Sequence, residues 1–200
     1  MATQYTPAQA ALLTGLAPSA IRKALESRIV PARKQRHGQA TRRLLGFDAL
    51  VCLKLEQLGM SQFSVPLRKE IYQQVIEHPE SDTLRPFEAV SVDVARARSE
   101  LSRTISDLRK AEKMVVVNPD VLRGVPIFRG TRIPVYSIAE MLEQGTRPSE
   151  ILEGYPRLSS SQLRLATLYA QANPRRGRPK TKLPIGARLL NTRRIRLDIA

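Results

Sequence analysis

The chain has 200 residues, of which 42% are apolar and 26% are charged, and its net charge is +15 at pH 7. A chain of this length can bury one sizeable hydrophobic core or two small ones. Its single cysteine, Cys52, excludes an intramolecular disulfide. No apolar stretch approaches the roughly 20 residues that span a bilayer, and the N-terminus lacks the pattern of a secretion signal. We therefore expect a soluble, cytoplasmic protein.

The positive charge is concentrated in two separated blocks. Residues 22–43 hold eight Lys and Arg against Glu26, a net charge of +7. Residues 174–200 hold nine against Asp198, a net charge of +8, so the rest of the chain is balanced. Two such blocks predict two contacts with anions, for which nucleic acid and a carboxylate-rich protein are the natural candidates.

The first 60 residues predict short helices around a basic hairpin. Thr6 followed by Pro7 marks the start of the first helix. Gly15 supplies a tight turn, and Pro18 opens a second helix with a cationic outer face. The next stretch, RIVPARKQRHGQATRRLLG, predicts two strands with cations on both sides. A third helix follows, with the apolar positions Phe47, Leu50, Val51, Leu53 and Leu58.

This order of elements resembles the winged helix-turn-helix of MerR-type regulators over residues 5–58. The positions that match are Tyr5, Gly15, Ile21, Arg22, Gly38 and Arg43. MerR regulators usually continue into a long dimerising coiled coil and an effector site, and neither is evident here. The resemblance implies DNA contacts from the second helix and the hairpin, through Ser19, Arg22, Lys23, Arg33, Lys34, Arg36, Arg42 and Arg43. The alternative is a small helical domain with a solvated basic face, although such faces usually mix both signs.

Residues 61–117 predict a connector that could help to form a dimer. A helix starts near Pro66, the segment SDTLRP breaks it, and residues 87–94 alternate as a strand does. From Val94 onward, apolar side chains recur at helical spacing, and MVVV at 114–117 predicts another strand. Nothing in this segment has a catalytic pattern.

Residues 118–173 predict a short strand followed by three short helices. VPIF forms the strand, and Pro134 and Pro148 each open a helix. Ser159 with Gln162 forms a capping box for the last helix. Such a unit is compact and could include a second arrangement of the helix-turn-helix kind. The whole chain is thus predicted to be mainly α with short β elements.

The stretch RGVPIFRGTRIPV, residues 123–135, could be a phosphate-binding loop, the lip of an active site or plain architecture. A phosphate loop aims successive backbone N–H groups at an anion, yet Pro126 and Pro134 stand where such donors are needed. An active site needs a nucleophile, paired carboxylates or metal ligands, and only Asp120 is close. Architecture is favoured, with Gly130 in a backbone conformation barred to other residues, while a dimer or DNA contact stays open.

On the architectural interpretation, Arg129 and Arg132 pair with nearby carboxylates. The candidates for these pairs are Glu140, Glu143 and Glu150.

This region closely resembles a small bacterial family, long described as a domain of unknown function, that occurs in antitoxins of the VapB kind. The resemblance covers about residues 118–170. Its signature residues are Gly124, Pro126, Gly130, Thr131, Arg132, Ile133, Pro134 and Val135, followed by Gly145, Glu150, Ile151, Tyr155 and Pro156. The resemblance implies pairing with a PIN-domain ribonuclease toxin.

Residues 174–200 carry too little apolar surface for a core of their own. DNA could receive this tail, because RGRP at 176–179 resembles an AT-hook core. A PIN-domain toxin is the favoured receiver, since its Mg²⁺-binding carboxylates could pair with guanidinium groups. A merely solvated tail is the remaining alternative. We expect toxin contacts from Arg188, Arg193, Arg194, Ile195, Arg196 and Leu197.

The sequence therefore predicts the antitoxin half of a type II toxin–antitoxin pair. Residues 1–60 would bind double-stranded operator DNA, 61–117 and 118–173 would help to assemble a homodimer, and 174–200 would inhibit a PIN-domain ribonuclease. The alternative is a MerR-like regulator without a toxin partner. A nuclease has little support, because no His, Asp and Glu cluster has ligand spacing. We expect no catalytic residue, metal, cofactor or membrane partner.

Overall fold

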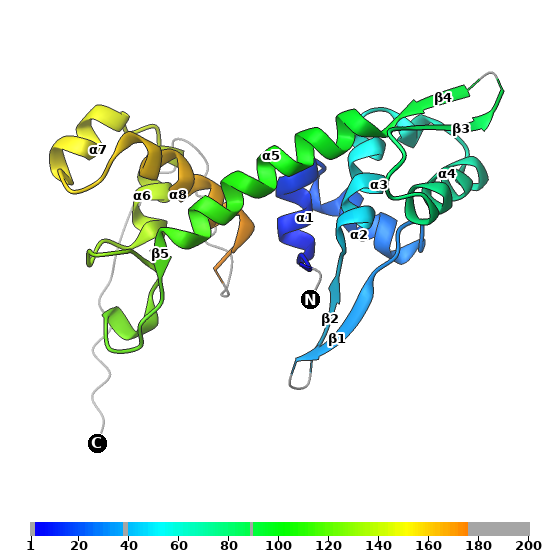
Figure 1. Ribbon diagram of the computed structural model, residues 1–200. Coiled ribbons are helices and arrows are strands. Elements are labelled where there is room, and N and C mark those ends of the chain that lie inside the picture. The colour runs from blue at the N-terminus through cyan, green and yellow to red at the C-terminus, as the bar shows by residue number, and fades with distance from the viewer. Residues whose placement is uncertain (1–2, 38–39, 89, 176–200) are drawn as a thin grey trace, which may run out of the picture.

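The computed structural model describes residues 3–37, 40–88 and 90–175. The chain is mainly helical with short antiparallel strand pairs, as the sequence predicts. Figure 1 shows two lobes joined by one long helix, α5 (Val94–Lys113). Among the helices of the described residues, none has the length and apolar character needed to cross a membrane.

The N-terminal lobe contains four helices, a short 3-10 turn and two hairpins. Its elements are α1 (Pro7–Thr14), α2 (Pro18–Glu26), β1 (Arg33–His37), β2 (Ala40–Leu44), α3 (Phe47–Gln57), η1 (Met60–Gln62), α4 (Val65–Glu77), β3 (Thr83–Phe87) and β4 (Val90–Asp93). The predicted start of α1 is confirmed: the Thr6 side chain accepts a hydrogen bond from the Gln9 backbone N–H, and the Gln9 side chain accepts one from the Thr6 N–H. Gly15 ends α1 with a φ of 77°.

The helix that starts near Pro66 ends at Glu77, before the segment SDTLRP, and most of that segment forms a strand that the sequence did not predict. Thr83–Phe87 forms β3, which pairs antiparallel with β4 and sets Leu84 opposite Val92. The strand expected over residues 87–94 is confirmed only for Val90–Asp93, which forms β4, whereas Phe87 is the last residue of β3. Pro86 is tolerated because it lies in the irregular part of the register, where a missing N–H costs no regular ladder bond.

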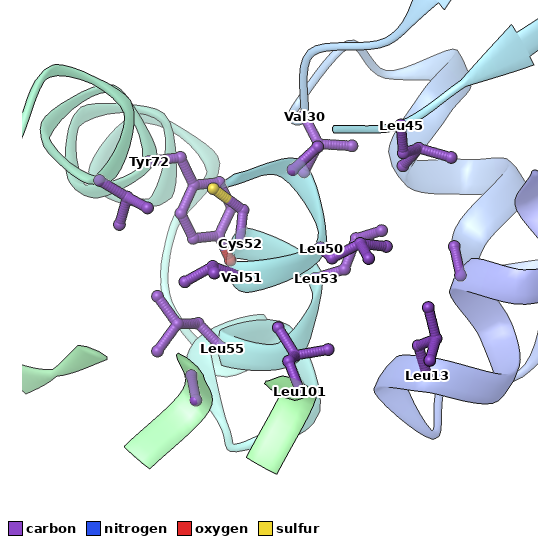
Figure 2. Close-up of a cluster of buried hydrophobic side chains, with 14 of the residues drawn as sticks. Leu13, Val30, Leu45, Leu50, Val51, Cys52, Leu53, Leu55, Tyr72 and Leu101 are labelled. Carbon is purple, nitrogen blue, oxygen red and sulfur yellow. The ribbon is translucent and has the colours of Figure 1, made fainter. Parts of the chain in front are cut away.

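One hydrophobic core joins the N-terminal lobe to α5. Helix α3 is its centre, and its Leu50, Val51, Cys52 and Leu53 side chains are completely buried. Figure 2 shows these residues between Leu13 of α1 on one side and Tyr72 of α4 on the other. Burying each large aliphatic side chain contributes about 1.5–3 kcal/mol to folding. Residues of the expected connector therefore share one core with the first 60 residues.

The C-terminal lobe has its own smaller core. Its elements are β5 (Val115–Val116), η2 (Leu122–Gly124), β6 (Ile127–Phe128), α6 (Val135–Glu143), α7 (Pro148–Gly154) and α8 (Ser160–Ala172). Val115 of β5 lies opposite Phe128 of β6, and both side chains are buried in this core. The predicted capping box of Ser159 and Gln162 is confirmed at the start of α8.

The two lobes are in direct contact. Helix α8 packs against α5 and α1, and Ala172 at its end belongs to the N-terminal core. Arg164 of α8 forms an ion pair with Asp107 of α5 at 3.4 Å.

A second ion pair joins α5 to the N-terminal lobe: Lys54 of α3 pairs with Glu100 of α5 at 2.9 Å. The hydrogen bond from Lys54, followed by that from Arg96, lowers the pKa of Glu100.

Candidate nucleic-acid interface

Helix α2 presents a polar, cationic face to solvent. Ile21, Ala24 and Leu25 are buried against the core, so the opposite side of the helix must face outward. Ser19, Arg22 and Lys23 lie on that outer side and are exposed. The sequence prediction for these three positions agrees with their placement in the fold.

The basic hairpin sorts its cations onto two faces. Residues directly opposite each other in an antiparallel pair share a face, and the register sets Lys34 opposite Arg43 and Arg36 opposite Thr41. Arg33 lies on the other face, opposite Leu44. Two like charges directly opposite each other are destabilising, which favours an anion bound over the Lys34–Arg43 pair.

A groove of about 720 Å³, here called the basic groove, lies where the end of α2, the base of the hairpin and α4 meet. Four cations line it, namely Arg28, Lys34, Arg43 and Lys69, together with the carboxylates of Glu26 and Glu77. No ion pair joins any of these six side chains within the described chain. No carboxylate of the described chain therefore neutralises the four cations through an ion pair.

Two of these cations, Arg28 and Lys69, were missed by the sequence reasoning. Arg28 lines the basic groove and has a left-handed backbone with a φ of 52°, which is uncommon outside glycine. Lys69 is an exposed residue of α4. The helical spacing of Ile71 and Val75 could have put Lys69 on an outer face, but no sequence signal brings α4 beside the hairpin.

A buried polar network beneath the basic groove fixes α4 to α3. Arg68 Nη1 donates to both carboxylate oxygens of Glu56, at 2.7 and 2.9 Å, and the Tyr72 hydroxyl donates to Glu56 Oε1 at 2.8 Å. Burial, followed by the charge of Glu56, raises the pKa of Tyr72 far above its usual value. The hydroxyl therefore stays protonated and keeps donating to Glu56.

The other predicted DNA-contacting residues lie in the same lobe. Arg33, Lys34, Arg36 and Arg43 are exposed, while Arg42 is half-buried. The structure thus brings the cations of α2 and the hairpin together on one lobe, although they come from separate elements of the sequence.

The residues of the motif at 123–135 stabilise the turn in which they lie. Gly124 and Gly130 have φ angles of 77° and 75°, in the region that favours glycine. The Thr131 hydroxyl donates to the Phe128 carbonyl at 2.9 Å and accepts from the Ile133 N–H at 3.1 Å. These bonds close the turn between β6 and α6, so the architectural interpretation agrees with the local geometry.

Two further signature residues, Pro126 and Pro134, shape the approach to α6. The Pro126 carbonyl accepts from the Val135 N–H at 3.0 Å, and Pro134 is the N-cap residue of α6. The proline ring fixes the φ angle of Pro134 at −67°, which sets the direction in which the chain enters α6.

The expected ion pairs of Arg129 and Arg132 are wrong. The Arg129 guanidinium donates to the backbone carbonyl of Lys113 at the end of α5, at 3.0 Å. No pair of Arg132 with a carboxylate occurs in the described chain.

The expected carboxylate partners bind other cations. Glu140 pairs with Arg175 at 3.1 Å, and Glu150 pairs with Arg147 at 3.4 Å. Closeness in the sequence therefore did not predict the partners of Arg129 and Arg132.

The described residues contain no group of three or more His, Cys, Asp or Glu side chains that could hold a metal ion. Cys52 is buried, and this burial raises the pKa of its thiol far above the usual value. A thiol in that state is a poor nucleophile.

The residues expected to bind a toxin lie outside the described residues. These are Arg188, Arg193, Arg194, Ile195, Arg196 and Leu197. The last residue described before them, Arg175, is held in place: its guanidinium lies 4.5 Å from the centre of the Tyr136 ring. The Tyr136 hydroxyl also donates to the Asn173 carbonyl at 2.6 Å.

The chain is similar to a solved structure, a relative and a family whose descriptions state no function. A crystal structure of Rv2018 from Mycobacterium tuberculosis matches 82% of this chain and 96% of that chain, at 14% identity and a TM-score of 0.34. The uncharacterized protein y4eO of Sinorhizobium fredii (strain NBRC 101917 / NGR234) is 37% identical over 110 residues, or 54% of this chain. That match spans 50% of the relative's own length. Residues 115–170 match the family described as a protein of unknown function, DUF433, which agrees with the family resemblance of the signature region.

Proposed function

We propose that this protein is a DNA-binding antitoxin: its N-terminal lobe binds duplex DNA as a winged helix-turn-helix, and its C-terminal tail inhibits a PIN-domain ribonuclease. The observation that carries the DNA half is a set of exposed cations without carboxylate partners in the described chain. They are Arg22, Lys23, Arg28, Arg33, Lys34, Arg36, Arg43 and Lys69.

The geometry of the lobe suits a duplex. Helix α2 presents Ser19, Arg22 and Lys23 on one face, as a helix in the major groove does. The hairpin carries cations on both of its faces, so it can contact phosphates on either side of its ribbon. Arg28 and Lys69 extend the basic surface to α4 and add phosphate contacts at the basic groove.

The toxin half rests on the family resemblance and on the charge of the tail. Metal-dependent ribonucleases hold several carboxylates around Mg²⁺, and arginine pairs with carboxylates in a fixed bidentate geometry. Nine cations against one acid in residues 174–200 offer such groups. Alternating Ile195, Leu197 and Ile199 supply an apolar edge for a strand or groove contact.

The two halves can be tested on one truncated protein. Removing residues 176–200 leaves Arg175 in its contacts with Tyr136 and Glu140, so the C-terminal lobe should keep its melting temperature. We expect the truncated chain to lose inhibition of the ribonuclease encoded by the adjacent gene, because every expected toxin contact is removed. Its affinity for the DNA upstream of its own gene should stay within about threefold, since a charge-assisted contact is worth roughly 1.5–3 kcal/mol and none of the proposed DNA contacts is lost.

Ribonuclease assays and fluorescence anisotropy measure the two activities separately. A matched variant, Arg22→Ala with Arg43→Ala, should show the reverse pattern: weakened DNA binding with inhibition intact. Loss of both activities together in either variant would contradict the proposed division of labour.

A second candidate is a DNA-binding regulator without a toxin partner. It is favoured by the exposed cations of α2, the hairpin and α4, which account for DNA binding without any contribution from residues 176–200. Co-purification with the product of the adjacent gene decides between the two. A stable complex supports the antitoxin, and a tagged chain that recovers only DNA supports the regulator.

A further inference from the structure

An apolar groove of about 460 Å³ lies between the end of α3, η1, the start of α4 and β4, on the N-terminal lobe. Its walls include Leu55, Leu58, Met60, Phe63, Leu67 and Val90. Leu58 was expected on the apolar face of the third helix, but it lies beyond the end of α3 and is 36% exposed. Phe63 is 47% exposed. Single exposed apolar residues are ordinary, whereas a hollow lined by several of them marks an interaction site.

An exposed aromatic side chain stands beside this apolar groove. Phe87 at the end of β3 is 51% exposed and lies directly opposite Val90 of β4. Residues that face each other across an antiparallel pair share a side of the hairpin, and Val90 lines the apolar groove. Phe87 therefore lies on the groove side of the hairpin. Figure 1 shows the β3–β4 hairpin reaching outward from the lobe beyond α4 and α5.

The charge of this region differs from that of the whole chain. Residues 61–93 contain three Lys and Arg against six Asp and Glu, a net charge of −3 in a chain of +15. Two copies that each carry +15 repel each other across most of their surface, so they approach at lower cost where the local net charge is not positive. The charged residues that line the groove are Asp93 and Arg96, and both have partners within the chain: Asp93 caps α5, and Arg96 pairs with Glu100 at 3.0 Å.

We propose that a second copy of this chain occupies the apolar groove in an isologous dimer, with Phe87 of each chain inserted into the groove of the other. A hollow next to a protruding aromatic residue is self-complementary under twofold rotation. The inference goes beyond the proposed function, because it requires neither DNA nor a toxin. It assigns the dimer contact expected of residues 61–117 to the β3–β4 hairpin, which the sequence did not predict.

Sedimentation equilibrium of the full chain, without DNA or partner protein, tests this dimer. We expect the mass of two chains at about 10 μM, and we expect Phe63→Glu and Phe87→Glu each to raise the dimer dissociation constant at least about 30-fold, the size of an aromatic hot spot. The matched control is Leu122→Glu, at a C-terminal-lobe residue that is 48% exposed, and it should leave the dissociation constant unchanged.

Mixing the two variants gives the sharper test. The Phe63→Glu chain keeps its Phe87, and the Phe87→Glu chain keeps its groove, so one of the two symmetric contacts survives in the heterodimer but neither survives in either homodimer. The mixture should therefore associate more tightly than either variant alone. Circular dichroism melting confirms that each variant is folded, and Phe63→Gln replaces Phe63→Glu if the charged variant is unfolded.

Any one of the following results would overturn the proposal. The first is a single-chain mass for the unmodified protein at about 100 μM, a hundred times the concentration at which a micromolar dimer half-dissociates. The second is equal weakening by Leu122→Glu, or no gain on mixing the two variants. The third is loss of the dimer on removal of residues 176–200, which would make the tail the occupant of the groove.

Discussion

The cations of α2 and the hairpin differ from three arginines of the C-terminal lobe in whether the chain itself binds them. In the N-terminal lobe, the exposed cations of α2 and the hairpin have no carboxylate partner in the described chain; they are Arg22, Lys23, Arg33, Lys34, Arg36 and Arg43. In the C-terminal lobe, Arg129, Arg147 and Arg175 are each bound to a carbonyl or a carboxylate of the protein itself. Cations that the fold leaves unpaired are available to a partner, whereas cations that it pairs are part of the architecture.

The residues that identify the family and the residues proposed to bind a ligand lie in different lobes. The signature of the C-terminal lobe identifies the DUF433 match, yet its glycines and Thr131 serve a turn of their own chain. The N-terminal lobe has a less specific sequence pattern, but its surface carries the groups that can act on an anion. A strong motif therefore need not mark the functional surface.

The N-terminal lobe contains a buried charged network around Glu56, and removing this carboxylate should have the largest effect on stability. Glu56 is a buried charged residue of the N-terminal lobe, and it accepts hydrogen bonds from Arg68 and Tyr72. We expect Glu56→Ala to lower the free energy of unfolding by about 3–5 kcal/mol, because it leaves the Arg68 guanidinium without its partner. Urea unfolding followed by circular dichroism measures the loss.

A double variant serves as the control for this prediction. Glu56→Leu with Arg68→Met removes both charges at once and should recover most of the stability, since replacing a buried pair by apolar groups is often neutral. A double variant as unstable as Glu56→Ala would show that the ion pair itself, rather than the orphaned arginine, determines the stability.

A smaller effect is expected at the turn of the C-terminal lobe. Gly130 has a φ of 75° with no atom near the position of an added Cβ, so substitution there costs backbone strain alone. Gly130→Val should destabilise the protein by about 1–3 kcal/mol. Gly154→Ala is the control, because Gly154 also has open space but no positive φ. Equal thermal melting of the two variants would count against the architectural role of Gly130.

The smallest effect has the opposite sign. Leu122 and Arg123 have φ angles of 49° and 57°, a left-handed conformation that is costly for residues with a Cβ. Arg123→Gly should therefore raise the free energy of unfolding by up to about 1 kcal/mol. Differential scanning calorimetry can detect the rise in melting temperature. A lower melting temperature would mean that the Arg123 side chain contributes more than its backbone strain costs.

Local sequence signals predicted most helix boundaries. Caps such as Thr6 and Ser159, together with Pro18 at a helix start, act within a few residues and so can be read from the sequence. The β3 strand was missed because Pro86 lies inside it and resembles a helix breaker. Its pairing partner β4 tolerates this proline only through an irregular register.

The candidate site was predicted in part. The charge count of residues 22–43 revealed α2 and the hairpin as a basic surface, but Lys69 depends on the packing of α4 beside them. The partners of Arg129 were predicted wrongly, because the side chain turns back to the carbonyl of Lys113 instead of reaching a helix ahead of it. The left-handed backbone of Arg123 could not be predicted from the sequence, because glycine is the residue type that usually indicates a positive φ.

The central claim is that the unpaired cations of the N-terminal lobe form a specific duplex site. The most direct test is the salt dependence of binding to DNA from upstream of its own gene, compared between two variants that lose the same charge. Lys34→Ala with Arg43→Ala should flatten the slope of log K against log salt by about 2, because each phosphate contact contributes roughly 0.9. Arg103→Ala with Arg109→Ala, on the exposed side of α5, should leave the slope unchanged. Equal slopes for the two variants would contradict the claim and assign binding to net charge alone.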